Sequence, residues 1–256
     1  MSEPRAWDDL APRIASALVM AGLGLGAIWL GGWAFLVFAS VIAGLMVWEA
    51  ARMFGSPRPV LDGGFAGLAL FLALALPGGF SLPLLFISAL VSAGMVTRDR
   101  GLYALFHAGI LLAAFALLDW RAGEGLALTL WLIAVIIASD VMGYFAGRLL
   151  GGPKFWPRVS PKKTWSGTVA GWAGAAAVGA GFAAATPLGW ALAPLSVLVA
   201  FAGQMGDIAE SAVKRRMGVK DSSNLIPGHG GVLDRCDALM GAALFTFLLT
   251  LAGFGG

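Results

Sequence analysis

Polar residues recur at helical spacing between positions 207 and 215 of the sequence. On a helix they would share one face, because steps of three and four residues return to the same side. These residues are Asp207, Glu210, Ser211, Lys214 and Arg215. Carboxylates are ligands that a hard divalent cation prefers, and the two cations match phosphate oxygens. The face therefore predicts a site for a metal-bound polyphosphate, although an amphipathic helix that touches lipid headgroups would have the same pattern.

A second group of chemically active residues lies between positions 227 and 237. Three glycines let the backbone there approach a ligand closely, and His229 stands among them. Asp234 and Asp237 are three residues apart, so a helix that begins here would present both on one side. Capping of that helix would explain one Asp. It does not easily explain two, together with Arg235 and His229, so the segment predicts part of an active site.

Two adjacent lysines stand between hydroxyl-bearing residues in a third polar segment. The segment comprises Ser160, Pro161, Lys162, Lys163 and Thr164. Two ammonium groups and two hydroxyls suit a nucleoside triphosphate, but the spacing is not that of a P-loop. The excess of Lys and Arg in cytoplasmic loops of membrane proteins would also place lysines here. On these residues alone, a nucleotide site and a topological signal both stay open.

Asp140 lies within a long apolar run, where a charged side chain is costly and usually faces the interior of a helix bundle. Gly143, Tyr144 and Gly147 follow on the same helical face, which therefore combines polar groups with close packing. This face predicts the inner wall of a polar cavity. An ion pair with Arg148 is the structural alternative for Asp140.

Composition limits the kind of molecule that must position these residues. The chain has 256 residues, of which 59% are hydrophobic and only 12% charged, and its mean hydropathy is +0.85. Soluble domains carry roughly 25% charged residues, so most of this chain must face lipid. The apolar runs are continuous rather than alternating, which argues against a β-barrel and indicates membrane-spanning helices. Cys236 is the single cysteine, so no intramolecular disulfide is expected.

About nine apolar segments are long enough to be transmembrane helices. They are residues 14–31, 33–50, 63–79, 81–97, 102–119, 126–147, 167–187, 189–206 and 236–254. With the N-terminus inside, all but one of the 17 basic residues lie on the cytoplasmic side, the exception being Arg121. The predicted fold is therefore an all-α polytopic membrane protein, a bundle of about nine transmembrane helices with a cytoplasm-facing polar site and the C-terminus outside.

The polar segments concentrate in the second half of the chain, which predicts two regions. Residues 1–119 would be N-terminal transmembrane helices that serve either dimerisation or a lipid gate, and residues 120–256 would be the catalytic region. Glycine, with 37 residues, lets membrane helices approach closely, so a homodimer is among the expected assemblies. Glu49, at the end of the second span, is weaker evidence of function than Asp140. His107 is expected to pack or hydrogen-bond within its helix bundle.

The chain from residue 140 onward resembles the phosphatidate cytidylyltransferase family, the CDP-diacylglycerol synthases. The long signature of that family is similar to a pattern formed here by Ser211, Lys214, Arg215, Lys220, Asp221, Ser223, Ile226, Pro227, His229, Gly230, Gly231, Asp234, Arg235 and Asp237. Residues 140–148, 160–164 and 206–211 look like three further motifs of the family. Cys236 and Ser166 depart from its usual residues, an aliphatic side chain and Glu. The first half is similar only as a hydrophobic bundle.

The resemblance implies a nucleotidyl transfer in phospholipid biosynthesis. The phosphate of phosphatidic acid would attack the α-phosphorus of CTP, giving CDP-diacylglycerol and pyrophosphate. The implied cofactor is Mg²⁺, as one or two divalent ions with or without a monovalent cation, held by Asp207, Asp234 and Asp237. The implied catalytic residues are these three with Lys214, Arg215 and His229. The implied substrate-binding residues are Ser160, Pro161, Lys162, Lys163, Thr164, Lys220, Asp221, Arg235, Asp140 and Tyr144.

The expected partners are CTP, phosphatidic acid and membrane lipid, and no nucleic acid. The expected location is the bacterial inner membrane, with the active site on the cytoplasmic side. Two alternatives within enzymes are a cytidylyltransferase for another lipid phosphate and a polyprenol kinase. A secondary transporter that uses Asp140 and Glu49 is the alternative from another class. A transporter, however, would be expected to have repeated halves with midplane polar residues in both.

Overall fold

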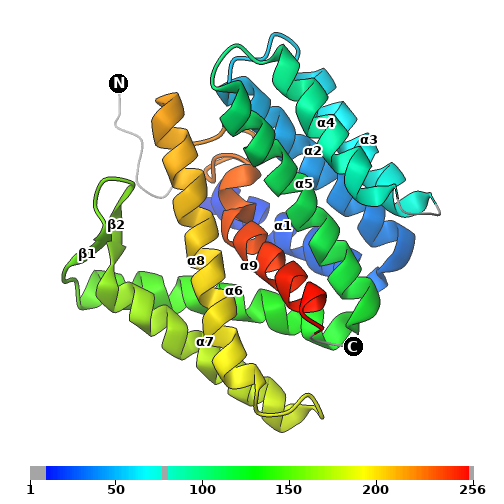
Figure 1. The fold of residues 1–256 in the computed structure, drawn as a ribbon. Coiled ribbons are helices and arrows are strands. Elements are labelled where there is room, and N and C mark those ends of the chain that lie inside the picture. Colours follow the sequence, from blue (N-terminus) through cyan, green and yellow to red (C-terminus); the bar gives the residue numbers. More distant parts are fainter. Residues whose placement is uncertain (1–9, 77–79, 254–256) are drawn as a thin grey trace. The chain divides into compact units, whose positions relative to one another are not determined.

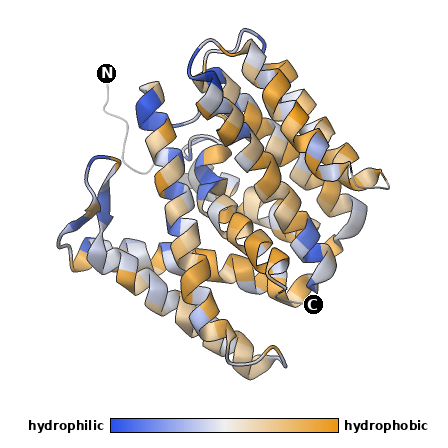
Figure 2. Ribbon diagram, viewed as in Figure 1, coloured by the Kyte–Doolittle hydropathy of each residue, from blue (hydrophilic) through white to orange (hydrophobic). Residues whose placement is uncertain are grey.

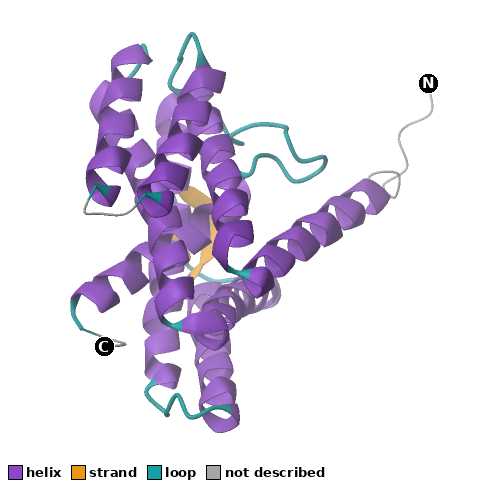
Figure 3. Cartoon of the chain, turned by 90° about the vertical axis from the view of Figure 1, so that its right-hand side faces the viewer, coloured by secondary structure: helices purple, strands orange, loops and turns teal. Residues whose placement is uncertain are grey.

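The computed structural model of the chain describes residues 10–76 and 80–253. Outside these ranges lie Arg5, which the sequence places inside, residues 77–79 at the end of the third predicted span, and residues 254–256. The described residues form nine helices and one small sheet (Figure 1). Helices account for nearly all of the regular structure, as the cartoon in Figure 3 shows.

Each predicted span overlaps one helix of the structure. The helices are α1 (Leu10–Leu30), α2 (Gly32–Met53), α3 (Pro59–Ala75), α4 (Ser81–Met95), α5 (Arg100–Gly123), α6 (Gly125–Leu149), α7 (Trp165–Ala185), α8 (Leu192–Met217) and α9 (Leu233–Leu251). Among the described residues, five helices are long and apolar enough to cross a membrane, namely α2, α5, α6, α7 and α8. A membrane protein rich in helices is thus confirmed, and spanning by the other four helices stays a prediction.

A short β-hairpin corrects the expectation of an all-α chain. Strand β1 (Lys154–Trp156) pairs antiparallel with β2 (Ser160–Thr164), and Lys154 lies opposite Thr164. The lysine motif is therefore a strand rather than a loop. Figure 2 shows this hairpin as hydrophilic, whereas the helices α6 and α7 that flank it in sequence are largely apolar.

The chain divides into two compact units. The first unit comprises Met1–Leu118 with Val219–Arg235, and the second comprises Asp119–Gly218 with Cys236–Gly256. The connection from α8 to α9, residues 219–232, is called the signature loop below; it belongs to the first unit, although the sequence analysis placed it in the second region. Whether residues 1–119 and 120–256 act as separate functional regions stays a prediction.

Aromatic and polar contacts hold α2, α4 and α5 together in the first unit. The ring of Tyr103 lies 5.3 Å from that of Phe54 and 5.6 Å from that of His107. His107 is fully buried, and its Nε2 lies 3.2 Å from the hydroxyl of Ser88. The expectation that His107 packs and hydrogen-bonds inside its bundle is confirmed.

Close backbone contacts pack the helices of the second unit. A Cβ on Gly167 of α7 would lie 2.6 Å from the carbonyl oxygen of Gly143 on α6, so only glycine fits there. A Cβ on Gly206 of α8 would likewise lie 2.5 Å from the carbonyl oxygen of Asp237 on α9. These contacts pack α6 against α7 and α8 against α9 within the same unit.

Candidate active site

Lys163 and Asp207 form an ion pair within the second unit. The Lys163 ammonium lies 2.5 Å from Oδ2 of Asp207, and both side chains keep about a quarter of their surface exposed. Oδ1 of Asp207 accepts a hydrogen bond of 3.3 Å from the hydroxyl of Ser211. A lysine expected to bind nucleotide thus contacts a carboxylate expected to bind metal, although 44 residues separate them in the sequence.

Thr164 fixes the end of the strand that carries Lys163. Its hydroxyl accepts a hydrogen bond of 3.2 Å from the backbone N–H of Gly167 and so caps α7. Its carbonyl oxygen accepts a bond of 3.0 Å from the hydroxyl of Thr168. The hydroxyl of Ser166 donates to the carbonyl oxygen of Gly151, which ties the start of α7 to the residues before β1. These bonds fix Thr164 next to Lys163, and the binding of substrate by Thr164 stays a prediction.

The other residues of the lysine motif lie on the hairpin. Lys162 is exposed and Ser160 half-buried, and both belong to β2 together with Pro161. Alternate side chains of a strand point to opposite faces. Lys162 and Lys163 therefore point to opposite sides of the strand, and the Asp207 contact belongs to the Lys163 side.

The predicted polar face of residues 207–215 is confirmed as part of one helix, α8. Within it, Lys214 forms an ion pair of 2.6 Å with Glu210, one turn earlier. Arg215 is exposed, and the helix ends at Gly218 in a left-handed conformation with φ of 78°. The same face of α8 therefore carries the carboxylate of Asp207 and, in the last turn of the helix, the cations Lys214 and Arg215.

Asp140 and Tyr144 lie exposed on α6. The Tyr144 hydroxyl accepts a hydrogen bond of 2.8 Å from the guanidinium of Arg148. Gly143 and Gly147 face the start of α7, since a Cβ on Gly143 would lie 3.2 Å from the carbonyl oxygen of Gly167 and a Cβ on Gly147 would lie 3.7 Å from its Cα. The predicted combination of polar groups and close packing is present on this helix.

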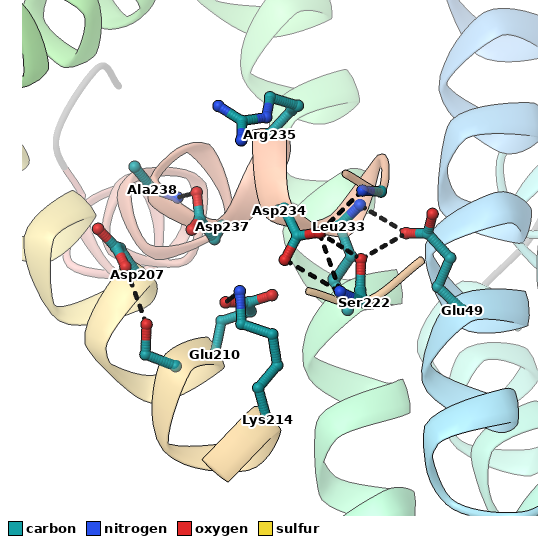
Figure 4. Close-up of polar contacts among 12 residues, drawn as sticks. Glu49, Asp207, Glu210, Lys214, Ser222, Leu233, Asp234, Arg235, Asp237 and Ala238 are labelled. Atoms are coloured by element: carbon teal, nitrogen blue, oxygen red, sulfur yellow. Dashed lines mark hydrogen bonds and ion pairs between the residues drawn. The ribbon is translucent and has the colours of Figure 1, made fainter. Parts of the chain in front are cut away.

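Asp237 stands where α9 crosses α8. The charged groups that act electrostatically on its carboxyl are Asp207, Lys214 and Asp140. Its Oδ1 accepts a hydrogen bond of 2.7 Å from the backbone N–H of Ala238 (Figure 4). Asp237 is thus within electrostatic range of Asp207, Asp140 and Lys214 in the second unit, and Asp207 also forms the ion pair with Lys163.

This donor set fits Mg²⁺. The ion is bound in proteins by one or two carboxylates that are completed by water and substrate phosphates, and Asp207 and Asp237 supply two. Within residues 10–76 and 80–253, no three His, Cys, Asp or Glu side chains form a complete cage. A metal held here would therefore need oxygen ligands from the substrate.

Asp234 organises the signature loop of the first unit. Its Oδ2 accepts hydrogen bonds from the backbone N–H of Ser222 (2.9 Å), the hydroxyl of Ser222 (2.8 Å) and the N–H of Gly231 (2.8 Å). Asp234 does not cap α9 as the alternative interpretation expected, because its donors Ser222 and Gly231 precede the helix. Its role as a metal ligand stays a prediction, which the structure leaves open.

Glu49 is the residue at this loop whose importance the sequence analysis missed. Its side chain is fully buried near the end of α2, and it accepts four hydrogen bonds from the signature loop and the first residue of α9. Figure 4 shows the bonds from Ser222 and Leu233. The available signal was its position, because an acid in an apolar helix is costly unless it is satisfied. The partners lie 173 to 184 residues away, so no local pattern could name them.

The remaining predicted residues lie on the same loop or beside it. His229 contacts the hydroxyl of Ser16 through Nδ1 at 3.0 Å, and its carbonyl oxygen accepts a bond of 3.0 Å from Nε of Arg235. The backbone N–H of Ile226 donates to the carbonyl oxygen of Gly230, which closes a turn around His229. Lys220 and Asp221 are exposed.

Comparisons with known proteins agree with this arrangement of motifs. The sequence profile described as "Cytidylyltransferase family" matches residues 11–252. The chain belongs to the cytidylyltransferase family. This match includes both units, so the N-terminal half is part of the family and not only a hydrophobic bundle of suitable length.

Individual members of the cytidylyltransferase family are similar over nearly the whole chain. A phosphatidate cytidylyltransferase of Brucella abortus biovar 1 (strain 9-941) is 38% identical over 250 residues, which cover 94% of this chain and 93% of that protein. One of Pseudomonas aeruginosa (strain PAO1) is 34% identical over 270 residues, 96% of this chain and 99% of that protein. One of Helicobacter pylori (strain J99) is 33% identical over 230 residues, 84% and 82% of the two chains.

Proposed function

We propose that the chain is a phosphatidate cytidylyltransferase, which makes CDP-diacylglycerol and pyrophosphate from CTP and phosphatidic acid. The observation that carries the proposal is the Lys163–Asp207 ion pair, in a chain whose full-length relatives have this name. This ion pair brings together an ammonium group that can bind a triphosphate and a carboxylate that can bind the metal ion of that triphosphate.

The cations of the second unit would bind the phosphates of CTP. Lys162 and Lys163 stand on the hairpin, and Lys214 and Arg215 stand on the last turn of α8. Ammonium and guanidinium groups bind phosphate oxygens through charge-assisted hydrogen bonds and neutralise a departing pyrophosphate. Because Lys163 and Lys214 already contact carboxylates, both are held in place before the nucleotide arrives.

Asp207 and Asp237 would hold Mg²⁺ in this proposal, and a part for Asp234 in binding the metal stays a prediction from the family resemblance. When bound, the ion neutralises phosphate charge and orients the triphosphate. If Asp234 binds the metal, its carboxylate either keeps its hydrogen bonds to Ser222 and Gly231 or exchanges some of them for the metal. The number of ions, including any monovalent cation, is to be determined by measuring how the reaction rate depends on the concentration of each cation.

The reaction needs positioning more than proton transfer. The phosphate of phosphatidic acid is already anionic, so the attack on the α-phosphorus requires no general base. The protein's task is to align the two substrates and to balance their charges. The side chain of Arg235 donates a hydrogen bond to the backbone carbonyl oxygen of His229. Arg235 would contribute one more cation, and His229 would contribute the turn of the signature loop.

The proposed location is the bacterial inner membrane, with the N-terminus and the active site on the cytoplasmic side. The five long apolar helices support a membrane protein. The asymmetric distribution of Lys and Arg supports the orientation. The lipid phosphate lies at headgroup depth there, and soluble CTP reaches it from the cytoplasm.

The proposal is tested with the purified protein in detergent, supplied with labelled CTP, phosphatidic acid and Mg²⁺. CDP-diacylglycerol should form, and Asp207→Asn should reduce its formation by at least 100-fold, roughly the loss expected when a group that stabilises charge in the transition state is removed. Glu124→Gln is the matched control, because it makes the same change in the same unit at the N-cap of α6. No product from a folded protein would contradict the proposal, and other lipid phosphates and polyprenols would then be tried.

A further inference from the structure

Glu49 is a fully buried carboxylate whose contacts all point to one segment. Burial of a carboxylate is strongly unfavourable unless hydrogen bonds replace its lost hydration. Oε1 accepts bonds from the Ser223 hydroxyl (2.5 Å) and the Val232 N–H (2.9 Å). Oε2 accepts bonds from the Ser222 hydroxyl (3.2 Å) and the Leu233 N–H (2.7 Å).

These bonds hold both ends of the signature loop. Ser222 and Ser223 stand near its beginning, and Val232 and Leu233 stand at its junction with α9. The first N–H groups of a helix have no partner within the helix, and negative charge is favourable there. Glu49 therefore supplies, from α2, the anionic cap that the N-terminus of α9 needs.

Ser222 connects Glu49 to Asp234. Its hydroxyl lies 3.2 Å from Oε2 of Glu49 and 2.8 Å from Oδ2 of Asp234, and its backbone N–H donates to Asp234 as well. One hydroxyl proton serves one acceptor at a time, so the positions of the two carboxylates depend on each other. A change at Glu49 is thus transmitted to a residue of the proposed site.

The packing around Glu49 leaves no room for another arrangement. A Cβ on Gly231 would lie 2.5 Å from Oε1 of Glu49 and would collide with the Ser222 hydroxyl. The loop can pass the carboxylate only with glycine at this position.

We propose that Glu49 is a positioning residue for the transferase reaction, which fixes the signature loop and through it Asp234 and Arg235. The inference rests on the proposed function for its catalytic consequence, but its structural part is independent of it. Glu49 lies in the half of the chain that carries none of the predicted site residues. It connects that half of the chain directly to the signature loop.

Glu49→Gln tests the charge while keeping the shape. Four donors converge on the two oxygens, and an amide would present an N–H₂ group to two of them, so those contacts would become repulsive. Asp62→Asn is the matched control: Asp62 is also fully buried in the first unit, but it accepts its bond from Ser56 in the turn before α3.

The first measurement is hydrogen exchange of peptides that cover residues 221–234, in detergent. Glu49→Gln should accelerate exchange at Val232 and Leu233, whose N–H groups donate to Glu49, and Asp62→Asn should leave it unchanged. Unchanged exchange in Glu49→Gln would overturn the structural part of the proposal, whatever reaction the protein catalyses.

The second measurement is the kinetics of CDP-diacylglycerol formation. Glu49→Gln should lower kcat by about 10- to 100-fold, the loss typical of residues that orient metal-site ligands, with a smaller change in KM for CTP. An equal loss of kcat in Asp62→Asn, or a loss that matches the fraction of unfolded protein, would overturn the catalytic part. If the wild-type protein forms no product, the proposed function fails, whereas the exchange result still decides the role of Glu49 in the loop.

Ser223→Ala keeps the test decisive if Glu49→Gln folds poorly. It removes one donor to Oε1 and leaves the carboxylate in place. If Glu49 acts through the loop, Ser223→Ala alone should accelerate exchange in the peptides that cover residues 221–234 and should lower kcat relative to the wild type. Wild-type exchange and wild-type kcat in a folded Ser223→Ala variant would contradict the proposal.

Discussion

The Lys163 ammonium lies 2.5 Å from a carboxylate oxygen of Asp207, which joins the β-hairpin to α8 within one unit. Neither group is fully buried, so each can exchange its present partner for a ligand. Binding of a metal–nucleotide complex would replace this pair with two contacts, carboxylate to metal and ammonium to phosphate. The charges of these two side chains therefore offset each other in the structure without ligands.

Replacement of Lys163 should weaken the binding of CTP. Lys163→Met is expected to raise KM for CTP by about 10- to 100-fold, since a hydrogen bond to a charged group contributes roughly 1.5–3 kcal/mol. Steady-state kinetics at saturating phosphatidic acid measure it. The control is Lys154→Met, because Lys154 is an exposed lysine on the other strand of the hairpin. An equal rise in KM there would show that the overall positive charge of the hairpin, and not the position of Lys163, determines CTP binding.

The cap at Thr164 should matter through Lys163. Thr164→Ala removes the hydroxyl that accepts from Gly167, which typically destabilises a helix by about 0.5–2 kcal/mol. The increased mobility of β2 should raise KM for CTP. Thr164→Ser restores the hydroxyl and should return both thermal stability and KM toward the wild-type values. Failure of serine to rescue either quantity would show that the cap is not the cause.

The close contact between α6 and α7 should tolerate no side chain. Gly167→Ala would place a Cβ 2.6 Å from the carbonyl oxygen of Gly143, and such overpacking costs about 1–3 kcal/mol. Thermal unfolding in detergent should report a lower midpoint. Gly181→Ala on the same helix meets no atom within 4 Å and should leave the midpoint nearly unchanged or slightly higher. Equal midpoints for both variants would contradict the described packing.

Removal of divalent cations should abolish the reaction. Chelation should reduce product formation to background, and Mg²⁺ should restore it. Asp237→Asn should raise the Mg²⁺ concentration needed for half-maximal rate by at least about 10-fold, because one of two carboxylate ligands is lost. Activity that persists in excess chelator would contradict the metal assignment. The shape of the Mg²⁺ dependence would indicate whether one ion or two take part.

Features that depend on local periodicity could be predicted from the sequence. The nine apolar segments each became a helix, and the polar face from Asp207 to Arg215 lies on one of them, because helical spacing is set by neighbours within a few residues. The glycines after Asp140 also pack as expected. These predictions needed no knowledge of distant contacts.

Features that depend on distant contacts could not be predicted. The hairpin joins near neighbours in the sequence, but it was missed because Pro161 and the adjacent lysines are poor signals for a strand. Glu49 was undervalued because its four partners lie on the signature loop, far away in the sequence. The assignment of that loop to the first unit follows from the same contacts.

The most direct test of the central claim follows the label from two forms of CTP. With phosphatidic acid and Mg²⁺, label on the α-phosphate should appear in the lipid product and label on the γ-phosphate should appear in pyrophosphate, and both should be lost in Asp207→Asn. Transfer of the γ-label to a lipid would instead identify a kinase and contradict the account. No transfer of either label by the folded protein, with any lipid phosphate, would contradict it as well.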